Sequence, residues 1–170
     1  ALQRQVLASG GSIERGTEVL GWKREAKALR AVATSSGDIQ ADEFILCGGS
    51  WSTKTAQDMG LRLPMQAGKG YSLTLPAPVE RPQICAIFTE ARIAVTPMAD
   101  SLRFGGTMEI AGLDESVTQR RVQGIIKAVP RYYPKFDPAQ FEGIQPWRGL
   151  RPCSPDGMPY LGRTQTAKNL

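Results

Sequence analysis

The chain has 170 residues, enough for one domain or slightly more, and its 41% hydrophobic and 22% charged residues are typical of a globular protein. Histidine is absent, which excludes Ser–His and Cys–His nucleophiles and histidine-containing metal sites, so a bound cofactor would carry any chemistry. The net charge of +5 comes from scattered basic residues, without the clustered patch of a nucleic-acid-binding protein. No apolar run reaches the roughly 18 residues of a membrane span.

The first third of the chain predicts a helix, a hairpin and a strand–turn–helix unit. The helix covers residues 2–7 and stops before Gly10 and Gly11. The hairpin pairs a strand at 29–34 with a return strand at 39–41. The unbroken apolar run at 44–47, the Gly48–Gly49 turn and a polar helix at 52–59 then follow in the order typical of a buried central strand in an α/β sheet.

After Pro64 the pattern changes to short strands with polar turns between them, which predicts an antiparallel sheet. Residues 71–75 alternate as a half-buried strand does, and further strands are expected at 84–88, 93–96 and 102–106. A helix capped by Asp114 and ended by Pro130 follows. Its apolar stripe predicts core packing and comprises Val117, Val122, Ile125, Ile126 and Val129.

The three cysteines lie far apart at positions 47, 85 and 153, and none belongs to a C-x-x-C pair. This spacing argues against a disulfide framework and against a zinc site, so we expect free thiols and no bound metal. Because Cys47 ends the apolar run, we expect its thiol to be buried and slow to react.

Two segments are candidates for a functional site. Gly48 and Gly49 would let a ligand approach the backbone closely, next to the free N–H groups of a helix start. This signal is weak, since most such turns are only turns and the dinucleotide fingerprint G-x-G-x-x-G does not occur. The other candidate is Arg151, whose backbone Pro152 favours in an extended conformation. A guanidinium fixed in this way suits a bidentate grip on a carboxylate, although a solvated surface arginine gives the same pattern.

Four stretches, in order and spread over most of the chain, carry a resemblance to a known family. They are ADEFILCGGSWS at 41–52, GKGYSLT at 68–74, RFGGTME at 103–109 and GLRPCSPDGMPYLGR at 149–163. The sequence resembles the FAD-dependent glycine, sarcosine and D-amino-acid oxidase family, and the second and fourth stretches favour its D-amino-acid dehydrogenase branch. The resemblance implies an α+β fold. It comprises a partial α/β FAD-binding domain at 1–62, an antiparallel substrate-binding sheet with a packed helix at 63–146, and a return segment to the FAD domain at 147–170.

The resemblance also implies residue roles and an activity. Arg151 would hold the substrate carboxylate. FAD would be contacted by Val19, Gly48, Gly49, Ser50, Trp51, Lys69, Gly70, Asp156, Gly157 and Gly162. The implied reaction is oxidative deamination of D-amino acids by hydride transfer from the substrate Cα to the flavin, with electrons passed to a membrane acceptor rather than to oxygen.

Two alternatives to this activity stay open. One is a glycine- or sarcosine-type amine oxidase. Related oxidases carry a tyrosine contact to substrate near the position of Ala94, so that contact is not carried over here. The other alternative is a non-catalytic α+β module that binds a small anion through Arg151.

Three expectations concern the chain as it stands. The family's Gly-rich phosphate loop does not occur in it, so we expect a folded part of a longer protein that does not retain FAD alone. The run at 44–47 would lack parallel neighbours, so we expect exposed apolar surface near it and self-association. The resemblance implies a location in the cytoplasm or peripheral to the cytoplasmic face of the inner membrane.

Overall fold

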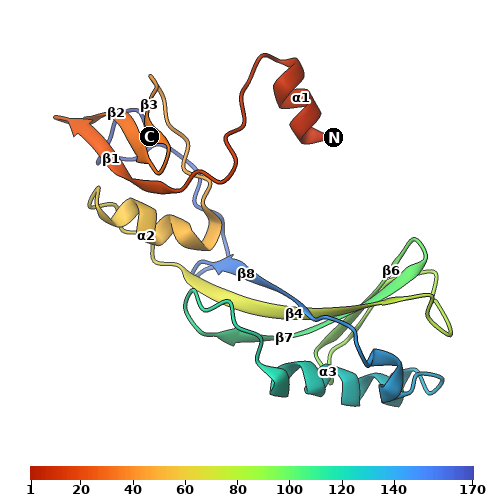
Figure 1. Cartoon of the computed structure of the whole chain (residues 1–170). Coiled ribbons are helices and arrows are strands. Elements are labelled where there is room, and N and C mark those ends of the chain that lie inside the picture. The colour runs from red at the N-terminus through yellow and green to blue at the C-terminus, as the bar shows by residue number, and fades with distance from the viewer. The chain divides into compact units, whose positions relative to one another are not determined.

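A computed structural model describes residues 1–170 and divides the chain into two compact units. Unit 1 comprises Ala1–Pro64 and Pro159–Leu170, and unit 2 comprises Met65–Met158. The chain combines helices with two antiparallel sheets, which confirms the α+β class (Figure 1). The division falls at 65 and 159, not at 63 and 147, because residues 147–153 form a strand of the unit 2 sheet. No helix is both long and apolar enough to cross a membrane.

Unit 1 is built on a three-stranded sheet in the order β1-β2-β3. Its elements are α1 (Leu2–Ala8), β1 (Val19–Glu25), β2 (Ala28–Thr34), β3 (Gly37–Gln40), the 3-10 turn η1 (Gly49–Trp51) and α2 (Ser52–Gln57). The predicted hairpin is the β2–β3 pair, in which Val32 lies opposite Ile39. The C-terminus completes a small core, because Leu170 packs with Leu29 and the Asn169 side chain exchanges two hydrogen bonds of 2.9 Å with the Leu29 backbone.

The predicted strand at 44–47 is wrong, because these residues form no strand. Ile45 is 87% exposed, and the Phe44 N–H donates to the Asn169 carbonyl at 2.9 Å rather than to a strand. A strand that is apolar on both faces needs neighbours on both sides, and the sheet of unit 1 offers it none. The expected exposed apolar surface is therefore confirmed, whereas the expected burial of Cys47 is wrong. None of the three cysteines forms a disulfide.

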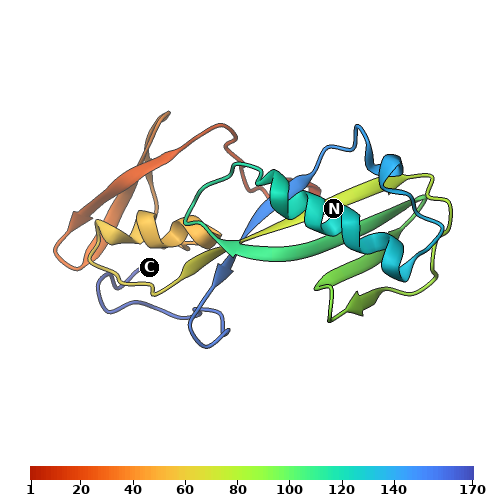
Figure 2. The same cartoon turned by 90° about the horizontal axis from the view of Figure 1, so that it is seen from below.

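Unit 2 is a five-stranded antiparallel sheet in the order β5-β6-β7-β4-β8, with one face covered by α3 (Figure 2). Its elements are β4 (Gln66–Pro76), β5 (Ala86–Phe88), β6 (Ile93–Met98), β7 (Ser101–Ile110), α3 (Gln119–Tyr132), η2 (Pro138–Phe141) and β8 (Trp147–Cys153). The strands expected after Pro64 all form, and β8 is an additional strand that the sequence pattern does not predict.

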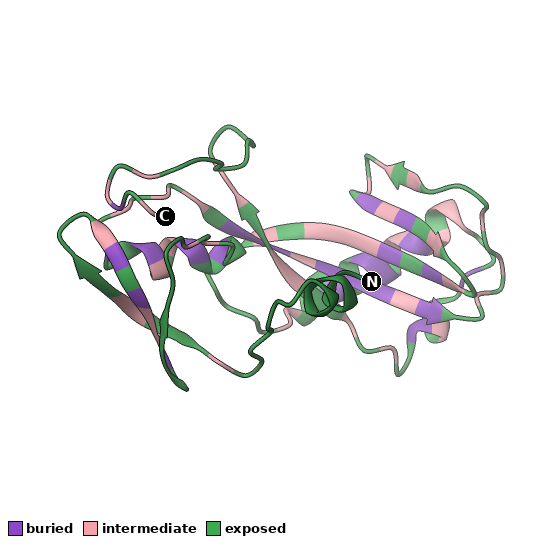
Figure 3. Ribbon diagram, turned by 90° about the horizontal axis from the view of Figure 1, so that it is seen from above, coloured by how far each residue is buried: buried purple, intermediate pink, exposed green.

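The core of unit 2 lies between α3 and the sheet. The predicted stripe is buried there at Val122, Ile125, Ile126 and Val129. Phe104 of β7 is 0% exposed, and three aromatic rings surround it with centroids 5.4–6.3 Å away. In Figure 3 buried stretches alternate with intermediate and exposed ones along the long strands of this sheet, and α3 lies behind it.

The predicted ends of the long helix need correction at both sides. Asp114 does not cap it, because its carboxylate binds Lys69 and the Ser116 backbone, and the helix begins at Gln119 after Thr118. At the other end the helix continues past Pro130 to Tyr132. Proline removes one helix hydrogen bond and its ring crowds the carbonyl of residue i−4, and α3 accordingly ends two residues after Pro130.

The alternation of side chains gives the sheet a helix-covered face and an opposite face, here called the open face. On β4, Lys69, Tyr71 and Leu73 point to the helix-covered face. The strand register then assigns to the open face Gly68, Gly70 and Ser72 of β4, Ala94 of β6, Gly105, Met108 and Ile110 of β7, and Trp147, Gly149, Arg151 and Cys153 of β8.

Candidate functional site

Arg151 lies on the open face of β8, at the edge of the unit 2 sheet. Its backbone is paired with Gly68 of β4, so the ladder, together with Pro152, holds it extended. The guanidinium is exposed and has no hydrogen-bond or ion-pair partner. A cation on a rigid strand with all its donors free can accept a carboxylate in a bidentate pair.

The part of the open face beside Arg151, here called the floor, is formed by glycine backbone with apolar side chains lying over it. The Trp147 ring lies over Gly149, where any Cβ would clash with it. Met108 and Cys153 likewise lie over Gly68, where a Cβ would be 2.6 Å from the Met108 sulfur. The Trp147 side chain is 63% exposed. Close approach of these side chains to the backbone therefore makes a low apolar surface next to a free cation.

Ser72 adds a polar atom to the same face. Its residue is 5% exposed, and its Oγ is buried without any hydrogen-bond partner. The neighbouring strands place Trp147 on one side of it and Gly105 on the other. A buried hydroxyl without a partner is destabilising, and a role in binding is one reason for a protein to keep such a group.

The helix-covered face carries a buried charge cluster around Lys69, which is 0% exposed. Its Nζ lies 2.7 Å from Asp114 and 2.9 Å from Glu109, and it donates to the Ser116 carbonyl at 2.9 Å. The hydrogen bond to Asp114 raises the pKa of Lys69 against the opposing effect of burial. The same contacts lower the pKa of Asp114, and contacts from Lys69 and Tyr71 lower that of Glu109 to about 2. The groups of this cluster are therefore ionised, and the Lys69 ammonium has its hydrogen-bond donors occupied.

These ion pairs limit how Lys69 can contact a cofactor. Its side chain is committed to two carboxylates on the covered face, so this residue could reach a flavin only through its backbone. Gly70, the next residue, lies on the open face opposite Gly149. The register thus brings Gly70 and Arg151 onto one face of unit 2 but keeps the Lys69 side chain away from it.

The other residues expected to contact FAD lie in loops and at the start of short elements. In unit 1, Val19 opens β1, while Gly48, Gly49 and Trp51 are exposed around η1, and Gly49 has a φ of 54°. Ser50 is buried there, and Gly162 is exposed with a φ of 143°. In unit 2, the Asp156 carboxylate accepts the Met158 N–H, which lowers its pKa, and Gly157 follows in the same turn. These eight FAD contacts stay predictions.

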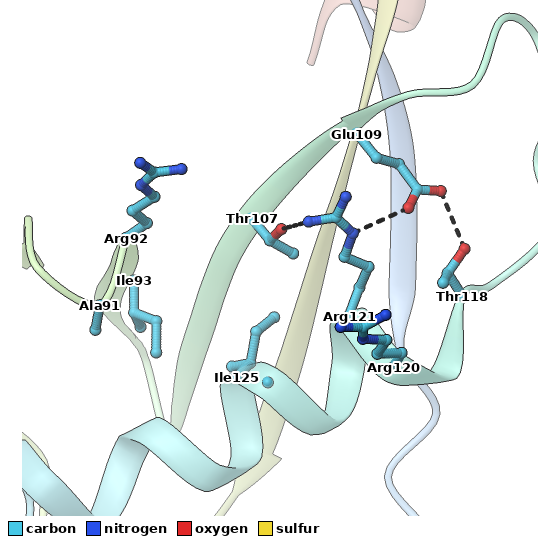
Figure 4. A pocket seen from close by; sticks show the side chains of 10 residues that line it. Ala91, Arg92, Ile93, Thr107, Glu109, Thr118, Arg120, Arg121 and Ile125 are labelled. Atoms are coloured by element: carbon cyan, nitrogen blue, oxygen red, sulfur yellow. Dashed lines mark hydrogen bonds and ion pairs between the residues drawn. The ribbon is translucent and has the colours of Figure 1, made fainter.

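The sequence analysis missed a pocket of about 630 Å³ at the start of α3 (Figure 4). It is lined by Ala91, Arg92, Ile93, Thr107, Glu109, Thr118, Arg120, Arg121, Gly124 and Ile125. The Arg121 guanidinium donates to Glu109 and to Thr107, both at 3.2 Å, as the dashed lines in Figure 4 show. One sequence signal was present: the first turn of α3 has two arginines and no acidic residue.

The fold and the comparisons with known proteins agree. The FAD dependent oxidoreductase family, DAO, matches residues 1–170, and the chain belongs to this family. Within it, the chain is 33% identical over 156 residues to a D-amino acid dehydrogenase of Vibrio atlanticus, covering 91% of this chain and 37% of the relative. It is 35% identical over 159 residues to the enzyme of that name from Chromohalobacter salexigens, covering 92% of this chain and 37% of the relative.

Solved structures give the same fold. A glycine oxidase from Geobacillus kaustophilus aligns with a TM-score of 0.80 at 25% identity, covering 94% of this chain and 42% of that protein. An iminodiacetate oxidase from Chelativorans sp. BNC1 aligns with a TM-score of 0.80 at 24% identity, covering 98% of this chain and 45% of that protein. The chain thus spans 37–45% of the length of these four proteins.

Proposed function

We propose that the protein oxidatively deaminates D-amino acids with FAD as cofactor, and that electrons pass from it to an acceptor other than oxygen. The observation that carries this proposal is the free Arg151 guanidinium on the open face, next to an apolar floor. Membership of the DAO family and the names of its D-amino acid dehydrogenase relatives support it. We also propose a cytoplasmic location, or a peripheral one at the cytoplasmic face of the inner membrane.

The residues of the open face suit this chemistry. Arg151 would bind the substrate carboxylate through two charge-assisted hydrogen bonds and so fix the substrate Cα over the glycine floor. Trp147 and Met108 would pack against its side chain and exclude water. The open face carries no carboxylate, and the chain has no histidine, so no residue there would act as a base. This suits hydride loss from an amino acid whose amine is neutral.

Bound FAD would supply the hydride acceptor. The exposed backbone at Gly48 and Gly49 would fit against one edge of it, because glycine allows close approach there. We propose further FAD contacts in unit 1 at Val19, Ser50, Trp51 and Gly162, and in unit 2 at Gly70, Asp156 and Gly157.

A glycine- or sarcosine-type oxidase is the second candidate, since a glycine oxidase is among the structures with the same fold. The open face favours a substrate with a larger side chain. Ser72, Gly105 and Ala94 lie side by side across three neighbouring strands, all small. Small residues at these positions would suit a substrate side chain that glycine lacks.

The test is steady-state kinetics, with a D-amino acid and a dye acceptor, of a longer flavin-loaded protein that contains this chain. Arg151→Lys keeps the charge but loses the planar fork, so kcat/KM should fall by a factor of about 10 or more, mainly through KM, from roughly 1.5–3 kcal/mol of lost bonding. Arg148→Lys is the matched control, because Arg148 lies on the same strand but faces the opposite side. Wild-type kinetics for Arg151→Lys would remove the main support for the proposal. Turnover that consumes oxygen as fast as it reduces the dye would contradict the acceptor.

A further inference from the structure

A row of residues crosses the open face of the unit 2 sheet from one edge to the other. The strand pairings place one residue of each strand in line, in the order Ile87, Ala94, Gly105, Ser72 and Trp147. The three central residues are small and are here called the small-residue row. Ile87 and Trp147, at its two ends, are 73% and 63% exposed. Small side chains therefore occupy three neighbouring strands, with a large exposed apolar side chain at either end.

Ser72 is the first residue of this row that stability does not explain. The chain holds one buried side-chain polar atom without a hydrogen-bond partner, and it is the Ser72 Oγ. Neither Gly105 nor Ala94, its neighbours along the row, has a side chain that could bond it. Alanine at position 72 would avoid the cost of an unpaired hydroxyl, so the fold alone gives no reason for the serine.

Gly105 is a second and independent case. It lies in β7, an interior strand of the sheet, where glycine weakens the strand and often marks the close approach of a ligand. Its φ is not positive, so its conformation does not require glycine. Packing does not require it either, because a Cβ there would lie 3.8 Å from the nearest atoms, the Ser72 Cβ and the Tyr71 carbonyl oxygen. At Gly149, by contrast, a Cβ would clash with the Trp147 ring.

The row lies within reach of a substrate bound to Arg151. Ser72 follows Gly68, the residue opposite Arg151, by four positions along β4. At about 3.3 Å per residue, the two Cα positions are roughly 13 Å apart. With its guanidinium turned along β8 towards Trp147, Arg151 would hold the substrate carboxylate part of the way to Ser72. The substrate side chain would then extend over the row.

We propose that the small-residue row receives the substrate side chain, and that the Ser72 hydroxyl selects D-amino acids whose side chain ends in an uncharged hydrogen-bonding group. This inference rests on the activity proposed above. A hydroxyl both donates and accepts, so an amide or hydroxyl group would satisfy it, whereas an aliphatic side chain would leave it unpaired. The row itself has no charged residue, so a charged side chain would lose its hydration there without a counter-charge. Trp147, opposite Ser72 and mostly exposed, would move aside to admit the polar group.

The ratio of kcat/KM for D-asparagine to that for D-leucine tests the role of Ser72, because the two substrates have the same branched shape. The ratio is measured in a longer flavin-loaded protein that contains this chain. Wild type should prefer D-asparagine, and Ser72→Ala should lower the ratio by about tenfold, because only D-asparagine loses a hydrogen bond. Ser101→Ala is the matched control, because the Ser101 hydroxyl already donates to the Met98 carbonyl at the far end of the same ladder.

The outcomes separate this inference from the activity on which it rests. An unchanged ratio in Ser72→Ala, or a wild-type preference for D-leucine, would overturn the role of Ser72 while the proposed activity stands. Failure of the wild type to oxidise any D-amino acid would refute the proposed activity, and the inference with it.

Gly105→Ala tests the place of the substrate side chain. In the 170-residue chain the urea midpoint of unfolding should stay unchanged or rise, because the Cβ fits and glycine weakens a strand. In the longer flavin-loaded protein kcat/KM should fall by about tenfold for D-asparagine and D-leucine, mainly through KM, and much less for D-alanine, because the added methyl group takes the space of a longer side chain. Gly124→Ala on α3, where a Cβ also meets no atom within 4 Å, is the matched control and should leave the kinetics unchanged. Wild-type kinetics for Gly105→Ala, or an equal loss with all three substrates, would overturn this placement.

Discussion

Ser72→Ala should make the protein more stable. The Ser72 Oγ is buried without a partner, and an unsatisfied buried polar group costs about 1–3 kcal/mol. Alanine keeps the Cβ and removes only the oxygen, so little cavity results beside Gly105 and Trp147. Taking the lower end of that range, we expect a gain of about 1 kcal/mol and a rise of about 2–4 °C in the unfolding midpoint.

The assay is urea unfolding of the chain followed by tryptophan fluorescence. Ser101→Ala is the matched control, because its hydroxyl donates to the Met98 carbonyl at 2.9 Å, so the same substitution should be neutral or destabilising there. A loss of stability in Ser72→Ala would refute the reasoning, since it would mean that the hydroxyl has a partner. In a longer flavin-loaded protein that contains this chain, a gain in stability together with a higher KM would identify Ser72 as a substrate contact.

Four further outcomes are expected. Phe104→Ala should lower the free energy of unfolding by about 3–5 kcal/mol in urea titrations, because Phe104 is 0% exposed within an aromatic cluster. The pKa of Glu109 falls from 4.5 to about 2 on folding, so the stability that this residue contributes is complete above pH 4.5 and is lost as the pH falls towards 2. Glu109→Gln should therefore make the free energy of unfolding less dependent on pH in this acidic range. Cys47 is exposed, and a thiol reagent should modify it as fast in the native chain as in urea. Titration of the 170-residue chain with FAD should show no stoichiometric micromolar binding, and a fluorescence change that saturates at one equivalent would contradict this.

Elements with a strong local pattern could be predicted from the sequence. The hairpin at β2–β3 has a turn cluster between two strands, and the stripe on α3 repeats at helical spacing, so each is specified by neighbouring residues. The run at 44–47 has the composition of a buried strand, but a strand also needs partners, and these are not a property of the run itself. β8 shows the reverse case. Gly149 and Pro152 interrupt it, and only the ladder to β4 makes it a strand.

The candidate sites were less predictable, for the same reason. Arg151 was identified from its neighbours, but the face on which it lies depends on the register of β8 against β4. The partners of Lys69 come 40 and 45 residues later, at Glu109 and Asp114, so its closure into an ion-pair cluster could not be read from the Gly-Lys-Gly motif. The pocket gathers residues from three separate segments, and only the paired arginines at the start of α3 hinted at it.

The edge position of β8 has a consequence for the order in which the sheet forms and opens. The residues that β4 pairs with on β7 are closer in the sequence than those that it pairs with on β8. Gln66, for example, pairs with Cys153. Pairings between residues distant in sequence are slow to close, so we expect β8 to join the sheet last. It also has few buried residues, and such edge segments open first in the native state. Arg151 therefore lies on an edge strand whose backbone amides should exchange faster than those of the central strands β4 and β7, and occupation of its guanidinium by a carboxylate should slow that exchange.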